Sequence, residues 1–186
     1  MNARRVALSG ALLLWGTAAL AAQSAQSAQS AQSAQSAQSA QSAQEVRTNA
    51  FDDPFFAISN ALPDCPLPAG PFITGAEKLA ETHHRAERGT TCWLAGRCSK
   101  PNSYAYDAGI AQALKHKLAA HNPFTDSTLW VTVQGRVVYI EGCARRPGLE
   151  PAIEAFVAAL PDVQRAVAAI RTDPRARPPY KLRSAP

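Results

Sequence analysis

Histidine, glutamate and cysteine side chains lie close together in one stretch of the sequence, where they could bind a metal ion. The residues are His83, His84, Glu87, Cys92 and Cys98. On a helix, His83 and Glu87 would stand one turn apart, so both could contact one ion. Adjacent histidines point to different faces, and the spacing of the two cysteines is wider than the two to four residues usual in zinc sites. We therefore expect no metal site. The alternative is a periplasmic metal-binding protein.

The same stretch contains a possible nucleophile and base, Cys92 and His83. A cysteine in a disulfide cannot form the thiolate that such catalysis needs. The sequence has no Gly-x-Ser-x-Gly motif, no phosphate-binding loop and no Cys-x-x-Cys-His haem motif. We expect a protein that is not an enzyme, with no cofactor and no small-molecule substrate.

The four cysteines form an even set, which in an exported protein indicates two disulfides. Three pairings are possible, and the sequence does not choose between them. We favour Cys92 with Cys98, which closes a small loop, and Cys65 with Cys143. A long-range bond would attach the first half of the mature chain to the second and stabilise it by roughly 2–4 kcal/mol.

The N-terminal residues have the pattern of an export signal. Arg4 and Arg5 precede an apolar run over residues 6–20, which ends in small residues of the kind that a signal peptidase reads. We expect residues 1–21 to be removed after Ala21, which places the mature protein in the periplasm. A membrane anchor is the alternative, but the run is short for a span of about 20 apolar residues.

Seven Gln-Ser-Ala units and a final Gln occupy residues 23–44. They contain no charged or aromatic residue and nothing larger than Ala to bury, so they cannot offset the entropy of an ordered backbone. We expect residues 22–44 to be a disordered linker. The remaining chain has the length of one domain.

The positive charge of the chain is concentrated near its C-terminus. Removal of Arg4 and Arg5 lowers the net charge from +5 to +3. The surplus lies in residues 173–186, a basic, proline-rich tail with four cations and one acidic residue. Because the charge describes a tail and the chain is exported, we expect no nucleic-acid partner.

The second half of the mature chain has a clear pattern of helices and strands. Ile110, Leu114 and Leu118 form one apolar stripe in a helix expected over residues 104–121. Strands are expected over residues 129–134 and 137–143, with a tight turn at Gly135. A helix over residues 150–160 and a strand over residues 163–171 follow. The helix, strand, strand, helix, strand order predicts two helices on one face of a three-stranded sheet.

This half of the chain resembles the BON domain, a small α/β module of periplasmic and outer-membrane proteins. The resemblance is carried by the spacing of Asp107, Ile110, Leu114 and Leu118, by the hairpin VTVQGRVVYIEG with Gly135 and Gly142, and by PDVQRAVAAI. It covers about residues 107–172 and consists of apolar and glycine positions. Unlike most family members, the chain has one copy. The expected fold class is therefore α+β, with a BON-like two-layer unit over residues 104–172.

The first half, residues 45–103, reads as a disulfide-stapled N-terminal extension with one helix. Five prolines in residues 51–71 indicate an extended segment, held to the surface by Phe51, Phe55, Phe56 and Ile58. Thr74 and Glu77 form a capping box that should begin a helix ending near Arg88. We expect residues 90–104 to be a loop.

The BON resemblance implies association with anionic phospholipid or with an envelope protein as partner. The candidate lipid-binding residues are Lys115, Lys117, Arg145 and Arg146. Each Lys or Arg near an anionic surface contributes about 1 kcal/mol, although ordinary solubilising charge explains any one of them equally well. The alternative is a protein-interaction module without lipid binding, with residues 178–180 (Pro-Pro-Tyr) and a flexible arm as docking elements.

Overall fold

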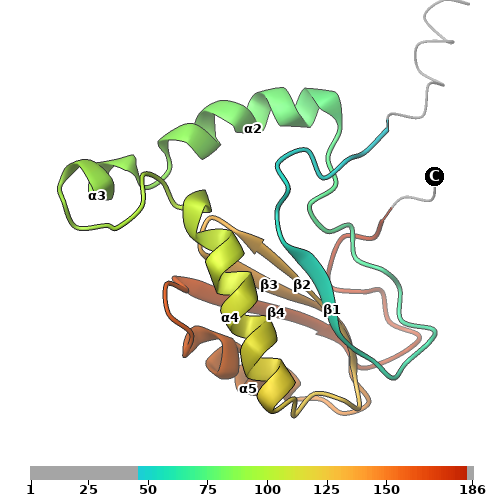
Figure 1. Ribbon diagram of the computed structural model, residues 1–186. Coiled ribbons are helices and arrows are strands. Elements are labelled where there is room, and N and C mark those ends of the chain that lie inside the picture. Colours follow the sequence, from blue (N-terminus) through green and yellow to red (C-terminus); the bar gives the residue numbers. More distant parts are fainter. Residues whose placement is uncertain (1–45, 184–186) are drawn as a thin grey trace, which may run out of the picture. The chain divides into compact units, whose positions relative to one another are not determined.

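The computed structural model describes residues 46–183. The expected export signal (1–21), the expected linker (22–44) and the last three residues lie outside this range. Within it, the helices and strands follow one another as β1 (Phe55–Asn60), α2 (Gly75–Glu87), α3 (Thr90–Leu94), the 3-10 turn η1 (Tyr104–Tyr106), α4 (Asp107–Ala120), β2 (Thr128–Gln134), β3 (Val137–Cys143), α5 (Leu149–Ala158) and β4 (Arg165–Arg171) (Figure 1).

The four strands of residues 46–183 form one mixed sheet in the order β1-β2-β3-β4. β2 pairs antiparallel with β1 and β3, whereas β3 and β4 are parallel and are connected through α5. The expected α+β class is confirmed, and α4, β2, β3, α5 and β4 follow in the order expected from the sequence. The expected sheet of three strands is wrong, because the proline-rich segment adds β1 beside β2.

The core lies between the sheet and the two helices α4 and α5, which pack on one of its faces (Figure 1). Ile110 and Leu114 of α4 and Ile153 and Val157 of α5 are almost completely buried. The sheet contributes the apolar side of each strand, namely Leu129, Val131, Val133, Val138, Ile140 and Ile170. Phe56 and Ile58 of β1 pack against this core. Burial on this scale stabilises the unit by about 1.5–3 kcal/mol for each large aliphatic side chain.

Two glycines allow the hairpin to form. Gly135 and Arg136, the two turn residues, both have positive φ, as expected for the turn whose twist matches that of paired strands. Gly142 has a φ of 153°, and a Cβ atom there would overlap the carbonyl oxygen of Thr128 on the neighbouring strand. Gly142 therefore allows close approach of the two strands where β2 begins and β3 ends.

Two disulfides are present, Cys65–Cys143 and Cys92–Cys98. These are the two pairings favoured from the sequence. The first joins the proline-rich segment to the end of β3, across 78 positions of the chain, whereas the second closes a loop of 6. Disulfides form in oxidising surroundings, so the two bonds indicate an extracytoplasmic compartment.

The described part of the basic tail is held against the proline-rich segment. Ala69 N donates to Lys181 O at 2.8 Å, and Arg183 N donates to Leu67 O at 3.1 Å. Tyr180 is buried beside the Cys65–Cys143 disulfide, and its hydroxyl donates to Pro66 O at 2.9 Å. Tyr180 therefore cannot be the exposed docking element that the sequence suggested.

Candidate interaction surface

Helix α2 is unusual because none of its residues is buried. The expected capping box is present: Glu77 N donates to Thr74 Oγ1, and Thr74 N donates to Glu77 Oε2 at 2.8 Å. Arg47 forms an ion pair with Glu77 at 2.7 Å and helps to hold the first turn. Leu79 is 79% exposed. In a protein of this size, an amphipathic helix normally buries its apolar side, so α2 is available for contact with something else.

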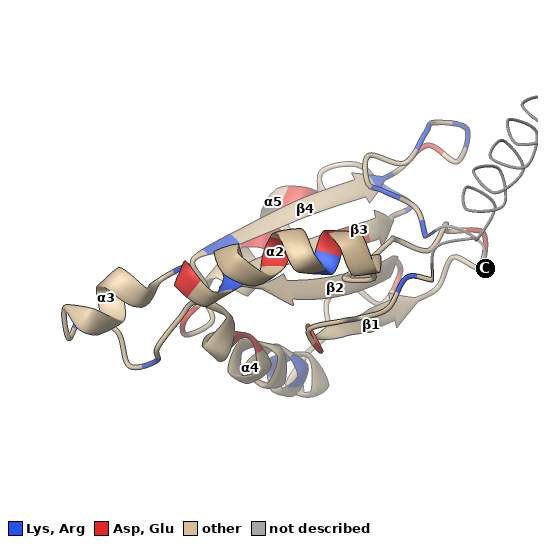
Figure 2. Ribbon diagram, turned by 90° about the horizontal axis from the view of Figure 1, so that it is seen from above, with Lys and Arg blue, Asp and Glu red and all other residues tan. Residues whose placement is uncertain are grey.

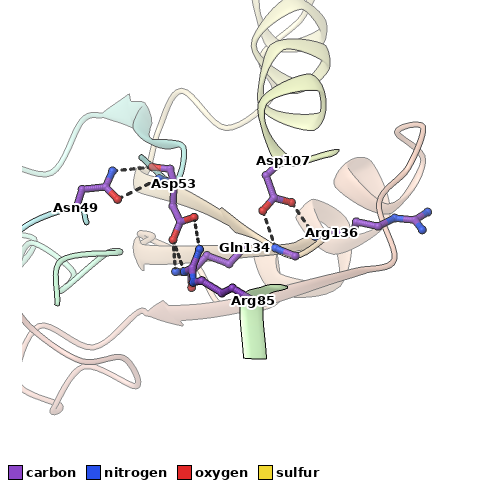
Figure 3. Close-up of polar contacts among 7 residues, drawn as sticks. Asn49, Asp53, Arg85, Asp107, Gln134 and Arg136 are labelled. Atoms are coloured by element: carbon purple, nitrogen blue, oxygen red, sulfur yellow. Dashed lines mark hydrogen bonds and ion pairs between the residues drawn. The ribbon is translucent and has the colours of Figure 1, made fainter. Parts of the chain in front are cut away.

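A cluster of polar side chains fixes the C-terminal end of α2 to the sheet (Figure 3). Arg85 of α2 donates two hydrogen bonds to Asp53, at 2.8 and 2.6 Å. Gln134 of β2 donates to the same carboxylate at 2.6 Å, and the Asn49 side chain pairs with the Asp53 backbone. We call Asn49, Asp53, Arg85 and Gln134 the Asp53 cluster. It joins three segments that are distant in the sequence.

The Arg85 guanidinium is also enclosed by aromatic rings. Its central carbon lies 4.0 Å from the ring centroid of Phe51 and 4.4 Å from that of Tyr104. Burial lowers the pKa of Arg85, but the hydrogen bonds and charge of Asp53 outweigh burial and hold the pKa above its ordinary value. Because the Arg85–Asp53 pair is largely buried, with side chains 11% and 5% exposed, loss of either partner would leave an uncompensated charge.

A second buried carboxylate, Asp107, holds the hairpin turn (Figure 3). Asp107 begins α4 and accepts hydrogen bonds from Gly135 N at 2.6 Å and Arg136 N at 2.8 Å. Burial raises the pKa of Asp107 above its ordinary value, against the opposing effect of these two donors. The Asp107 of the BON-like pattern therefore has a structural task, which is to connect α4 to the turn between β2 and β3.

A pocket of about 340 Å³ opens beside these two carboxylates, with Phe51, Tyr104 and Asn102 in its wall. Each carboxylate oxygen of Asp53 and Asp107 already accepts a hydrogen bond from the protein. These groups are thus engaged in holding the fold together.

Helix α3 and the loop that follows it project from the rest of the described chain (Figures 1 and 2). The sequence predicted a loop over residues 90–104, but Thr90–Leu94 form a short helix. Gly89 begins it with a φ of 91°, and a Cβ atom at Gly89 would overlap the Ser103 side chain. We call residues 88–100 the α3 tip, and α2 and the α3 tip together the arm.

Apolar side chains are exposed on the α3 tip. Trp93 is 45% exposed and Leu94 is 81% exposed. Both lie inside the loop that the Cys92–Cys98 disulfide closes. A covalently closed loop holds its side chains in place at a smaller loss of conformational entropy than an open one. The sequence contains this signal, an aromatic and an aliphatic residue between paired cysteines, but does not show that they face solvent.

All charged side chains in the α3 tip are cations. Residues 88–106 contain Arg88, Arg97 and Lys100 and no acidic residue. Arg97 is exposed and has no side-chain hydrogen bond or ion pair within residues 46–183. Arg88 is half-buried and lies near the ring of Tyr104. Lys100, also half-buried, lies near the ring of Tyr106 and donates to Ala105 O at 3.0 Å. This group of cations was not predicted from the sequence, because basic and acidic residues nearly balance over residues 45–103 as a whole.

The four lysines and arginines that the sequence suggested for lipid binding do not form one patch. Lys117 donates to Phe156 O at 2.7 Å, and Lys115 lies 4.5 Å from the Phe56 ring centroid, toward the opposite side of α4. Arg146 forms an exposed ion pair with Asp126 at 3.1 Å, and Arg145 is exposed. Two of the four are thus engaged with acceptors of the protein itself.

The disulfide engages two of the residues considered for a metal site. Cys92 and Cys98 are bonded to each other, which leaves His83 and Glu87 as an exposed pair at 3.3 Å. Within residues 46–183, no three His, Cys, Asp or Glu side chains are placed to hold one ion.

Comparison with known proteins found no matching family model, curated protein or solved structure. Among the described residues, no helix has the length and apolar character needed to cross a bilayer.

Proposed function

We propose that this chain is a non-catalytic, periplasmic BON-type module that binds anionic phospholipid or another envelope component through its arm. The observation that carries the proposal is the α3 tip. It combines exposed Trp93, Leu94 and Arg97 with two half-buried cations, Arg88 and Lys100, and no acidic residue. Aromatic and aliphatic side chains beside cations are the features with which peripheral proteins bind anionic membranes.

The BON assignment is supported by the order of elements and by the glycines. Residues 107–171 run as helix, strand, strand, helix, strand, and Gly135 and Gly142 occupy a positive-φ turn and a close approach between strands. The sheet and two helices then serve as a rigid support, and the arm is the part that makes contact.

Flotation of the exported protein with lipid vesicles tests this proposal. We expect it to rise with vesicles that contain anionic phospholipid at low salt, and to remain behind with purely zwitterionic vesicles. High salt should weaken binding, because screening reduces the attraction of cations to the surface. If the protein stays in the soluble fraction with both vesicle types at low salt, the lipid part of the proposal is wrong.

A protein partner is the second candidate, and exposure of Leu79 on α2 favours it. An amphipathic helix with a free apolar side can dock in a groove of another protein. In that case a pull-down from periplasmic extract should recover one partner, and Leu79→Asp should abolish the recovery. A partner that is retained equally by the Leu79→Asp variant would rule out this use of α2.

A further inference from the structure

We infer that the α3 tip inserts the side chains of Trp93 and Leu94 into the interface of an anionic bilayer. This step rests on the proposed function, because it requires binding to lipid. It goes further by assigning the contact to one disulfide-closed loop, in place of the lysines and arginines of α4 and of the loop after β3.

The first argument is the exposure of the two apolar side chains. Leu94 and Trp93 are exposed and are not part of the core. The helix α3, to which both belong, lies at the outer end of the arm (Figure 1). Leucine gains free energy when it leaves water for hydrocarbon, and tryptophan favours the boundary between hydrocarbon and headgroups. The pair is therefore suited to shallow insertion, with the ring at headgroup level.

Second, the N–H groups at the end of α3 are already hydrogen-bonded within the tip. Ala95 N donates to Thr91 O at 3.1 Å, Gly96 N to Trp93 O at 2.9 Å, and Arg97 N to Cys92 O at 3.0 Å. Peptide groups that enter the interface without partners carry a large desolvation penalty. In the α3 tip these three N–H groups keep their partners, so insertion avoids that penalty at residues 95–97.

The third argument is the charge around the apolar pair. Arg97 lies within the same closed loop, and Arg88 and Lys100 flank it in the sequence. The nearest acidic residue before the loop, Glu87, lies near His83. Cations near the rim of an inserting loop attract it to phosphate and other anionic headgroups. The charge therefore favours an anionic surface over a neutral one.

The size of the tip favours a bilayer over a protein. A stable protein interface buries about 800 Å² on each partner. A loop with two large exposed apolar side chains offers much less than that. A bilayer accepts any protruding apolar group without a matching pocket, so it suits a small projecting loop.

Tryptophan fluorescence provides the test. The chain has three tryptophans, Trp15, Trp93 and Trp130. Trp15 lies in the expected export signal, so in the protein cleaved after Ala21 the single change Trp130→Phe leaves emission from Trp93 alone. We expect emission at shorter wavelength on addition of vesicles containing anionic phospholipid, and quenching by lipids brominated near the start of the acyl chain. Zwitterionic vesicles should produce neither effect.

Two leucines of nearly equal exposure give a matched control. Leu94→Asp should weaken vesicle binding at least about tenfold, because it removes an inserting side chain and adds a negative charge. Leu79→Asp makes the same change on α2, where the leucine is 79% exposed against 81% for Leu94. We expect this variant to bind as well as the parent. Both sites are at the surface, so both variants should fold, which circular dichroism can verify.

The outcomes separate this inference from the proposed function. Flotation with anionic vesicles without a change in Trp93 emission overturns insertion and leaves lipid binding intact. Equal loss in the Leu79→Asp and Leu94→Asp variants overturns the assignment to the tip. Absence of flotation overturns both. A Trp93 shift that is lost in Leu94→Asp and kept in Leu79→Asp supports the inference.

Discussion

The Asp53–Arg85 pair joins the arm to the sheet through two short hydrogen bonds in a largely buried position. We predict that Arg85→Ala destabilises the protein by about 3–5 kcal/mol, because it leaves the Asp53 carboxylate buried without a cation. The matched control is Arg146→Ala, which removes an exposed ion pair and should change stability by no more than about 1 kcal/mol. Chemical denaturation measures both, and equal losses in the two variants would contradict this role of Arg85.

Glu141 predicts a pH dependence of stability. It lies opposite Trp130 on the sheet face away from α4 and α5, and burial raises its pKa above the ordinary value. The folded state therefore holds a proton over a pH range where the unfolded chain has released it. The resulting stability is fully present below the ordinary glutamate pKa and is lost as pH rises through the folded-state pKa.

Replacement of Glu141 by Gln removes that titration. We expect the Tm of Glu141→Gln, relative to the parent, to increase as pH rises through this range and to become constant above it. Asp107, whose pKa is also raised, is present in both proteins and cancels from the comparison. A Tm difference that does not change with pH would show that Glu141 is ordinarily hydrated in the folded state.

At the scale of elements, the two disulfides have different structural roles. Cys65–Cys143 joins the proline-rich segment to the end of β3, and Cys92–Cys98 shapes a single loop. From loop entropy we predict a loss of about 4 kcal/mol for the Cys65→Ser/Cys143→Ser double variant and about 2 kcal/mol for Cys92→Ser/Cys98→Ser. Unfolding by guanidinium without reductant measures both, and a larger loss for the short loop would contradict the expectation.

The elements of the second half were predictable because each has a local pattern. Leu129, Val131 and Val133 alternate with more polar residues, and Ile110 and Leu114 repeat at helical spacing. The strand β1 was not predictable, because its ladder with β2 depends on residues about 70 positions away, and prolines on both sides suggested only an extended chain. The same holds for the described tail, which depends on contact with residues 67–69.

The candidate site was harder to predict than the fold. Asp53, Arg85 and Gln134 come from three distant segments, and no spacing in the sequence connects them. The α3 tip was within reach, since Trp93 and Leu94 stand between two cysteines. The sequence does not show that these two side chains are exposed, because their exposure depends on the arrangement of α2 and the α3 tip.

At the scale of the described molecule, we expect the sheet and its two helices to provide support and the α3 tip to make contact. The edge strands of the sheet are partly capped by side chains: Glu154 accepts a hydrogen bond from Ala168 N of β4, and Asn122 donates to Ile58 O of β1. Such capping discourages pairing with another sheet. The α3 tip, with its exposed Trp93 and Leu94, is thus the part we expect to contact the membrane.

Hydrogen exchange of the protein with and without anionic vesicles measures directly which part makes contact. The account predicts slower exchange of the amides of residues 90–98 when vesicles are present, and no change in α4 or in residues 144–148. Slower exchange in α4 and residues 144–148, with residues 90–98 unaffected, would contradict it and return the lipid contact to Lys115, Lys117, Arg145 and Arg146.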